Sequence, residues 1–353
     1  MEGVHAIDSK SKIVLVTNHS QSFEKNSQKA GISVANLRFH FPMKFNRTLT
    51  DVHGIEVGHA QDHESLTGCT VILCRKGAVA GVDVRGSAPG TRETDLLDPI
   101  NLVQKVHAIV LSGGSAFGLE ATTGVVRYLE EQEIGFDMRT AKVPIVPAAI
   151  LYDLDIGQAA VRPDSAMGYL AASQASSAPP AEGNVGAGTG ASVGRMRGMK
   201  YAMKSGLGTW SINIHGVIIG ALVAVNAVGD IVDPKTGTKI AGLRSGSTLD
   251  WMKKGQARSA KQSNTVIGVV ATNAKLNKAA ATKVAQMAQD GLAQSIRPAH
   301  TMFDGDTIFA LATGEKKADV SMVGAFAAEI MAEAIVRAVK MAKSAGGLPG
   351  LHK

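Results

Sequence analysis

The pattern of hydrophobic and polar positions becomes regular only after about residue 50, and from there it predicts both strands and helices. The stretches "IVPAAILYDL", "TVIGVVAT" and "DTIFALATG" are short, apolar and rich in β-branched residues, as buried strands are. Helices are predicted for "KAAATKVAQMAQDGLAQSI" and "VSMVGAFAAEIMAEAIVRAVKMA". Strands and helices do not alternate strictly, so the order indicates a mixed α/β domain.

The first half of this regular region predicts further elements. "CTVILCRKGAVAGVDVRG" predicts two short strands joined by Lys76-Gly77, and "VHAIVLSGGSAFGLEATTGVVRYLEEQ" predicts a strand, a glycine-rich turn and a helix. A short helix is expected in "PDSAMGYLAASQA", and hairpins in "WSINIHGVIIGALVAVNAVGDIVDP". These elements supply enough apolar surface for a large core.

Two segments lack such a pattern. Residues 1–49 are weakly patterned and are expected to form an N-terminal extension. Residues 244–263, "RSGSTLDWMKKGQARSAKQS", carry no sustained strand or helix period and predict a linker. This polar run ends at Ser263-Asn264, and a buried strand begins abruptly at Thr265. The junction is either a loop meeting a strand or a point of chain cleavage.

Composition and charge exclude some classes of function. Of 353 residues 45% are hydrophobic and 19% charged, which is ordinary for one large or two smaller globular domains. The net charge of +7 raises the question of nucleic-acid binding. Aromatic residues are only 4%, however, and no helix-turn-helix or zinc-finger spacing is present. We therefore expect a solvated basic linker and no nucleic-acid partner.

The sequence also bears on the cellular compartment. Cys69 and Cys74 lie five residues apart in one predicted strand, so their side chains face opposite sides and cannot pair within it. Free thiols favour a reducing compartment. The apolar run near the N-terminus is too short for a signal peptide, and no run approaches a membrane span. The expectation is a cytoplasmic protein without a membrane partner.

Two glycine-rich motifs resemble known site signatures only in part. "GAGTGASVG", Gly186 to Gly194, lacks the preceding strand of a dinucleotide fingerprint, so no nucleotide cofactor is expected; its backbone is expected to approach a small ligand or another chain. The turn at Gly114-Ser115 resembles a nucleophile elbow, but Phe117 replaces the required glycine. The alternative is a helix N-terminus capped by Ser115, with free N–H groups directed into the space above the sheet.

Pairs of titratable residues offer further candidates. His59 and His63 lie four residues apart without a third ligand, so no metal is expected. Asp304 and Asp306 fall on one face of an extended segment, where two close carboxylates do not both ionise easily. They are either a proton relay beside a nucleophile or an Asp-Gly turn before a strand. Glu120 is either a ligand for a substrate ammonium or a favourable first-turn carboxylate.

Thr265 acquires a distinct chemistry if it becomes an N-terminus. Its α-amino group, with an ordinary pKa of about 7.7–8.0, can serve as the base for its own hydroxyl. Before cleavage the same hydroxyl can attack the carbonyl of Asn264, giving an ester that water releases. The autocleavage site Asn264/Thr265 would then mature the enzyme by the chemistry that it uses on substrate.

Five motifs together resemble the DmpA-type family of self-processing aminopeptidases, in family order over roughly residues 50 to 345: "TDVHGIEVGHAQD", "LSGGSAFGLEA", "NVGAGTGASVG", "NTVIGVVATNAKLN" and "FDGDTIFALATG". The family includes β-aminopeptidases and nylon-oligomer (6-aminohexanoate oligomer) hydrolases. The resemblance implies a four-layer αββα sandwich of the N-terminal-nucleophile type. It also implies one catalytic domain cut into a large part, 50–264, and a small part, 265–353.

The resemblance assigns roles to individual residues. Thr265 resembles the nucleophile, and Asp304 and Asp306 the acidic pair that orients it and relays protons. Tyr152, in "ILYDLD", and Asn226, in "VAVNAVG", match the positions that stabilise the oxyanion. The threonine and the Asp-x-Asp pair are closer to the nylon-oligomer hydrolases than to members with serine. Substrate contacts are expected from Glu120, Arg195, Gly114 and Ser115.

One position departs from that branch. Arg195 stands where the oligomer hydrolases have lysine, and a guanidinium stays charged, so it can act electrostatically but not as a neutral base. Lys200 and Lys204 are near in sequence and could compensate.

Three functions remain open from sequence. The leading one is a threonine amidohydrolase of linear amide oligomers or small peptides, without metal or cofactor; within it, an L-aminopeptidase/D-esterase or β-aminopeptidase is the alternative. An acyltransferase resembling the ornithine acetyltransferases is second, and a non-enzymatic basic binding protein is third. The resemblance also implies a homo-oligomer, a tetramer of cleaved pairs or a dimer.

Overall fold

The computed structural model describes residues 45–255 and 264–353. The greater part of the predicted N-terminal extension and the last eight residues before Asn264 lie outside the described residues. One compact unit begins at Phe45, and it already includes the buried Leu49 in the short helix η3 (Leu49–Asp51).

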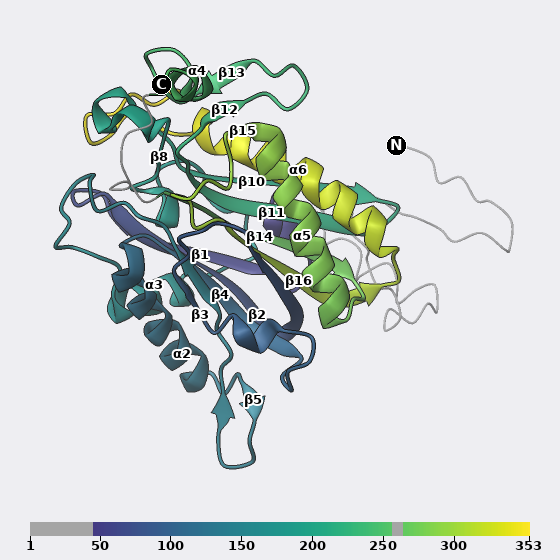
Figure 1. The fold of residues 1–353 in the computed structure, drawn as a ribbon. Coiled ribbons are helices and arrows are strands. Elements are labelled where there is room, and N and C mark those ends of the chain that lie inside the picture. Colours follow the sequence, from purple (N-terminus) through teal and green to yellow (C-terminus); the bar gives the residue numbers. More distant parts are fainter. Residues whose placement is uncertain (1–44, 256–263) are drawn as a thin grey trace, which may run out of the picture. The chain divides into compact units, whose positions relative to one another are not determined.

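A nine-stranded sheet forms the centre of this unit (Figure 1). Its order is β10-β11-β14-β16-β2-β4-β7-β3, with β1 also paired to β2. All neighbours are antiparallel except β14 with β16 and β4 with β7. The strands are β1 (Glu56–Asp62), β2 (Thr67–Val84), β3 (Thr91–Arg92), β4 (Lys105–Ser112), β7 (Ala148–Ile150), β10 (Leu207–Ile214), β11 (Val217–Asn226), β14 (Thr265–Ala274) and β16 (Thr307–Lys316).

The long strand β2 corrects the prediction of two short strands at this place. Residues 67 to 84 form a single strand, with a shift of register between Leu73 and Ala78 and a left-handed Gly77 (φ 72°) in between. Its first half pairs with β1, its second half with β16, and both halves pair with β4. One irregular strand therefore takes part in both layers of the sheet. Two separate short strands would not connect the layers in this way.

Helices cover the outer face of each layer. Helices α5 (Lys278–Ser295) and α6 (Val320–Lys340) pack on β10, β11, β16 and the second half of β2, whereas α2 (Ala121–Glu131) and α3 (Ser165–Ser173) pack on β1, β4 and the first half of β2. Between the layers lies a separate apolar core, to which β14 contributes Ile267 and Val269 and β4 contributes Ile109 and Leu111. The αββα sandwich is confirmed.

Side-chain alternation distributes the core among these layers. On β14, Val266 and Val270 face α5 and α6, while Ile267 and Val269 face the inner core. Cys69 and Cys74 likewise fall in different clusters, the first under α2 and α3 and the second in the inner core. The sequence prediction that the two thiols face opposite sides is confirmed.

Glycine allows helices to approach the sheet closely. A Cβ on Gly208 of β10 would lie 2.1 Å from the carbonyl oxygen of Ala334 in α6, and one on Gly81 of β2 would lie 2.2 Å from the amide nitrogen of Thr282 in α5. Both contacts are far inside van der Waals distance. Close backbone packing thus accounts for part of the high glycine content.

The remaining elements are short. They are the strands β5 (Phe136–Asp137), β6 (Lys142–Val143), β8 (Ser192–Val193), β9 (Met203–Lys204), β12 (Asp230–Val232), β13 (Lys239–Ala241) and β15 (Ile296–Arg297), and the helix α4 (Thr248–Lys253). Helix α4 corrects the prediction that residues 244–263 lack regular structure, because the Ser247 side chain caps it by accepting the Asp250 N–H. Within the described residues, no helix is both long and apolar enough to cross a membrane.

Candidate active site

Thr265 is the first residue of β14 and lies opposite Asn226, the last residue of β11. Both residues are buried, with exposed fractions of 1% and 0%. Directly paired residues of antiparallel strands project their side chains on the same face. The structure therefore brings the predicted nucleophile next to one predicted oxyanion residue.

The Asn264–Thr265 junction is held by the segment that precedes β16. The Asn264 N–H donates to the Phe303 carbonyl at 2.8 Å, and the Gly305 N–H donates to the Asn264 carbonyl at 2.9 Å. The Thr265 hydroxyl also donates to the Asn264 carbonyl. The hydroxyl thus lies beside the carbonyl that it would attack, and Gly305 N–H is placed to stabilise negative charge on that oxygen.

The two aspartates lie at the same junction. Asp306 accepts the N–H of Val266, the residue after Thr265, at 2.8 Å through Oδ1. The backbone of Asp304 pairs with that of Asn264 in an isolated β-bridge, and Asp304 is 2% exposed. Burial and then the charge of Asp306 raise the pKa of Asp304 above its ordinary range. The structure therefore places both aspartates at the Asn264–Thr265 junction.

Asn226 joins the other two residues that the sequence indicated. Its Nδ2 donates to the Tyr152 carbonyl at 2.8 Å, and its Oδ1 accepts Arg195 Nη1 at 3.3 Å and Ser192 N–H at 3.1 Å. An amide nitrogen carries two hydrogens, so Nδ2 retains one for a further acceptor. Tyr152 contributes its backbone oxygen to this network, and its half-buried ring lies within 5.9 Å of the Arg195 guanidinium.

Arg195 is buried, with an exposed fraction of 1%. Its guanidinium donates to Asp155 Oδ2 at 2.5 Å, to the Tyr152 carbonyl at 3.2 Å and to Asn226. A planar guanidinium can make these contacts at once, whereas one ammonium cannot copy their geometry. The contacts support an electrostatic and positioning role at this place.

Lys204 is held by backbone carbonyls and makes no hydrogen bond to Thr265, Asn226 or the aspartate pair. Its ammonium is fully buried behind the glycine-rich loop and donates to the carbonyls of Gly188, Ala191 and Ser205 at 3.1, 2.8 and 2.6 Å. Burial lowers the pKa of Lys204 to about 7. Lys200, by contrast, is exposed.

The glycine-rich loop packs against the chain's own backbone, which corrects the expectation that it approaches a ligand or another chain. A Cβ on Gly188 would lie 2.3 Å from the amide of Leu207, and one on Gly194 would lie 2.0 Å from the amide of Leu243. Gly190 packs equally closely against the Asp153 side chain. The motif thus positions Ser192 and Arg195 rather than lining a binding site.

The turn at Gly114-Ser115 is built differently from the sequence prediction. Gly114 adopts a left-handed conformation (φ 81°) and is itself the N-cap residue of η5 (Ser115–Glu120), so Ser115 is not the cap. The Ser115 N–H donates to Leu151, so it is not free for a ligand. Because Leu151 directly precedes Tyr152, this contact places the turn close to Tyr152. Glu120 is exposed at the end of η5, immediately before α2, and not in a first turn.

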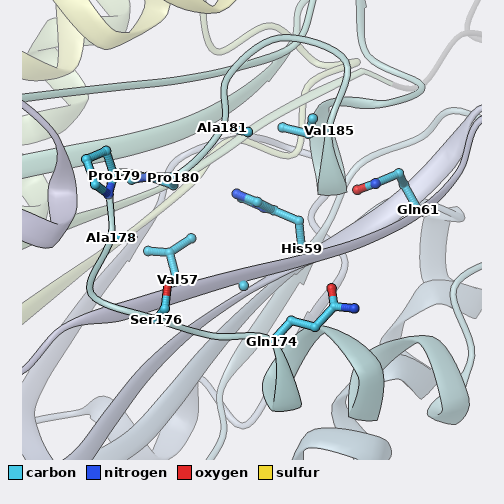
Figure 2. A pocket seen from close by; sticks show the side chains of 11 residues that line it. Val57, His59, Gln61, Gln174, Ser176, Ala178, Pro179, Pro180, Ala181 and Val185 are labelled. Atoms are coloured by element: carbon cyan, nitrogen blue, oxygen red, sulfur yellow. The ribbon is translucent and has the colours of Figure 1, made fainter.

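A pocket of about 310 Å³ lies along β1 (Figure 2), and its lining includes neither Thr265 nor Asn226, Asp304 or Asp306. His59 projects toward it, accompanied by Val57, Gln61 and Pro180. The imidazole shares a hydrogen bond with Thr70 at 3.0 Å, and burial lowers the pKa of His59 to about 4. Among the residues described, no group of three or more His, Cys, Asp or Glu side chains could hold a metal ion.

Sequence reasoning missed several residues that organise this site. His300 and Thr301 bind the carboxylates of Asp306 and Asp304, respectively. Both stand in "RPAHTMFDGD", directly before the acidic pair, so their proximity was visible in sequence although their contacts were not. The buried Asp153 was also missed: its carboxylate accepts Thr67 Oγ1 at 2.8 Å and the Gly114 N–H at 2.7 Å.

Comparison with known protein families places the chain. The model named Peptidase family S58 matches residues 47–352. The chain belongs to this family. It is 44% identical over 341 residues to an uncharacterized aminopeptidase of Mycobacterium leprae, covering 86% of this chain and 92% of that one. It is 31% identical over 329 residues to a 6-aminohexanoate-oligomer endohydrolase of Paenarthrobacter ureafaciens, covering 86% of each.

Solved structures agree on the fold of the S58 chain. An L-aminopeptidase D-Ala-esterase/amidase of Ochrobactrum anthropi, described as a variant of the Ntn hydrolase fold, superposes with a TM-score of 0.66 at 20% identity, over 86% of this chain and 88% of that one. A β-aminopeptidase of Burkholderia superposes with a TM-score of 0.63 at 22% identity, over 92% and 95%. With the family match, the chain is a hydrolase of amide bonds.

Proposed function

We propose that this S58 chain is a self-processing amidohydrolase whose nucleophile is the hydroxyl of Thr265. The contact of that hydroxyl with the Asn264 carbonyl supports the proposal most directly, because it already pairs the attacking oxygen with its target. The N–H of Gly305 on the same carbonyl supplies a donor for the charge that develops there.

In the maturation step, Thr265 Oγ1 attacks the carbonyl carbon of Asn264, and the peptide C–N bond breaks. The hydroxyl proton passes to the departing nitrogen, which becomes the α-amino group of Thr265, and an ester joins the two residues. Water then hydrolyses the ester to a carboxylate on Asn264 and a free hydroxyl on Thr265. The products are residues 1–264 and 265–353.

In the substrate reaction, the new amine takes the hydroxyl proton of Thr265 while the oxygen attacks an amide carbonyl. The second hydrogen of Asn226 Nδ2 is available for the oxyanion. Asp306, which binds the neighbouring N–H of Val266, orients the nucleophile. Burial raises the pKa of Asp304 to about 6, so this carboxyl can exchange a proton in weakly acidic solution. The leaving amine departs protonated, and water releases the acyl group.

The proposed substrates are small peptides or linear amide oligomers. Relatives named aminopeptidases are 42–44% identical to this chain, against 30–31% for the oligomer endohydrolases. This difference favours amino-terminal peptide hydrolysis as a second candidate beside oligomer hydrolysis. A panel of aminoacyl anilides, β-peptides and 6-aminohexanoate oligomers separates them, because the preferred class shows the highest kcat/KM.

The nucleophile is tested by Thr265→Ala and Thr265→Ser, with Thr272→Ala as control. Thr272 is a buried threonine of the same strand whose hydroxyl donates to the Ile218 carbonyl. We expect Thr265→Ala to abolish both chain cleavage and amide hydrolysis, and the other two variants to retain them. Hydrolysis at an unchanged rate in Thr265→Ala would refute the proposal.

Two further properties belong to this proposal. We expect a dimer or a tetramer of cleaved pairs, which light scattering measures, and a cytoplasmic location consistent with two buried free thiols. An acyltransferase remains the rival function: transfer of an acetyl group to ornithine faster than to water would establish it.

A further inference from the structure

One loop binds both carboxylates of the acidic pair. Residues 298–303 lead from β15 to Asp304, and two neighbours on this loop divide the pair between them. His300 contacts Asp306 with its ring and its backbone, and Thr301 contacts Asp304 with its hydroxyl and its backbone. The two carboxylates therefore have different surroundings although they are two residues apart.

Asp306 is surrounded by nitrogen donors. Its Oδ2 accepts His300 Nδ1 at 2.8 Å and the His300 N–H at 3.2 Å, and its Oδ1 accepts the Val266 N–H at 2.8 Å. All three bonds suit an ionised carboxylate, which only accepts. Asp304 Oδ2 accepts the Thr301 hydroxyl at 2.5 Å and the Thr301 N–H at 2.9 Å, and the pKa of Asp304 is raised by burial and by the charge of Asp306.

The chemistry of the contact assigns the tautomer of His300. Asp306 already accepts two backbone N–H groups, from His300 and Val266, so we assign the hydrogen of the side-chain contact to Nδ1 of His300. In a neutral ring Nε2 is then unprotonated, and this buried atom has no hydrogen-bond partner among the described residues.

The backbone of His300 is committed to the same contact. Its φ of 55° lies in the left-handed region, which few residues other than glycine adopt, although histidine is among the more frequent of them. In this conformation the backbone N–H and the ring Nδ1 both reach Oδ2 of Asp306. A left-handed residue at this point is therefore part of how the loop holds the carboxylate.

We propose that His300 is a positioning residue for amide hydrolysis: through Nδ1–H and its backbone N–H it holds the Asp306 side chain beside Thr265. The inference rests on the proposed function of Thr265 and extends it to the loop before β16. His300 acts through Asp306 and does not touch the reacting atoms.

Two substitutions distinguish the contribution of the side-chain donor of His300 from that of its backbone conformation. Both His300→Asn and His300→Gly tolerate a positive φ, but only asparagine keeps an N–H donor near the position of Nδ1. We expect His300→Gly to lower kcat on the best anilide of the panel by about 10-fold to 100-fold with little change in KM, the effect of one charged hydrogen bond. His300→Asn should stay within about 5-fold of the wild type, by the same reasoning.

A wild-type kcat in His300→Gly, or a kcat in His300→Asn as low as in His300→Gly, would overturn the inference. If the glycine variant does not fold, ¹⁵N NMR of histidine-labelled wild-type protein decides, with His300→Asn identifying the signal. A hydrogen on Nδ1 is expected, and a hydrogen on Nε2 alone would overturn the inference. This signal does not depend on Thr265 acting as nucleophile, so it distinguishes failure here from failure of the proposed function.

Discussion

Replacing Lys204 with methionine tests how the glycine-rich loop is held behind the candidate active site. The substitution keeps an unbranched side chain but removes the ammonium that donates to Gly188, Ala191 and Ser205. The Gly188 carbonyl still accepts the Ala191 N–H, and the Ala191 carbonyl still accepts the Ser205 N–H. The main loss therefore falls on the Ser205 carbonyl.

The expected magnitude has two parts. A buried carbonyl that loses its donor costs about 1–3 kcal/mol, and this loss is offset in part because a buried charge is removed as well. The second part depends on pH. Burial lowers the pKa of Lys204 to about 7 in the folded state, from 10.5, so above pH 7 the unfolded chain binds more protons than the folded one.

The sign of the pH dependence follows. Between about pH 7 and 10.5 the stability of the wild type rises relative to the methionine variant, at up to about 1.4 kcal/mol per pH unit. From pH 7 to pH 9 the unfolding free energy of the wild type minus that of the methionine variant should increase by about 2 kcal/mol. Well below pH 7 Lys204 is protonated in both states, and the difference between wild type and variant should approach a constant value.

Urea unfolding at pH 6, 7 and 9, followed by the fluorescence of the two tryptophans, measures this gap in unfolding free energy between wild type and variant. The exposed Lys200→Met serves as control, and its gap to the wild type should stay small at every pH. A gap for Lys204→Met that stays constant from pH 7 to pH 9 would show that the buried ammonium keeps an ordinary affinity for protons, and the reasoning would be wrong.

Two further substitutions address the junction and the guanidinium. In Gly305→Ala the new Cβ would lie 2.5 Å from the Ala88 carbonyl oxygen and 3.0 Å from Thr265 Oγ1. We therefore expect a loss of about 1–3 kcal/mol of stability, measured by denaturation, and at least tenfold slower chain cleavage, measured by timed mass spectrometry. Unchanged cleavage would contradict the close contact. Arg195→Lys should lose the contact to Asp155 and lower kcat about tenfold in steady-state assays. A wild-type kcat would show that a positive charge alone suffices at this position.

Much of the fold could be predicted because local pattern and layer structure agree. The apolar run from Thr265 is a strand that is buried on both faces, and the five-residue spacing of Cys69 and Cys74 correctly placed them on opposite sides. The continuity of β2 could not be predicted. A Lys-Gly pair favours a turn locally, and only pairing with β4 on both sides of Gly77 keeps the strand in one piece.

The candidate site was predictable where residue type carries the chemistry and not where contacts do. Thr265, Asn226 and the aspartate pair meet as their motifs indicated. His300 was missed because its contact with Asp306 depends on a left-handed backbone conformation that its residue type does not signal. The packing of the glycine-rich loop on the chain itself depends on distant segments, so no local pattern could reveal it.

The most direct test is the mass of the purified protein under denaturing conditions, with sequencing of the amino terminus of the smaller species. Division of 36.6 kDa in proportion to 264 and 89 residues predicts fragments of about 27 and about 9 kDa, with the smaller one beginning at Thr265. A single full-length species that persists for days in warm buffer and still hydrolyses amides would contradict a nucleophile released by cleavage at Asn264.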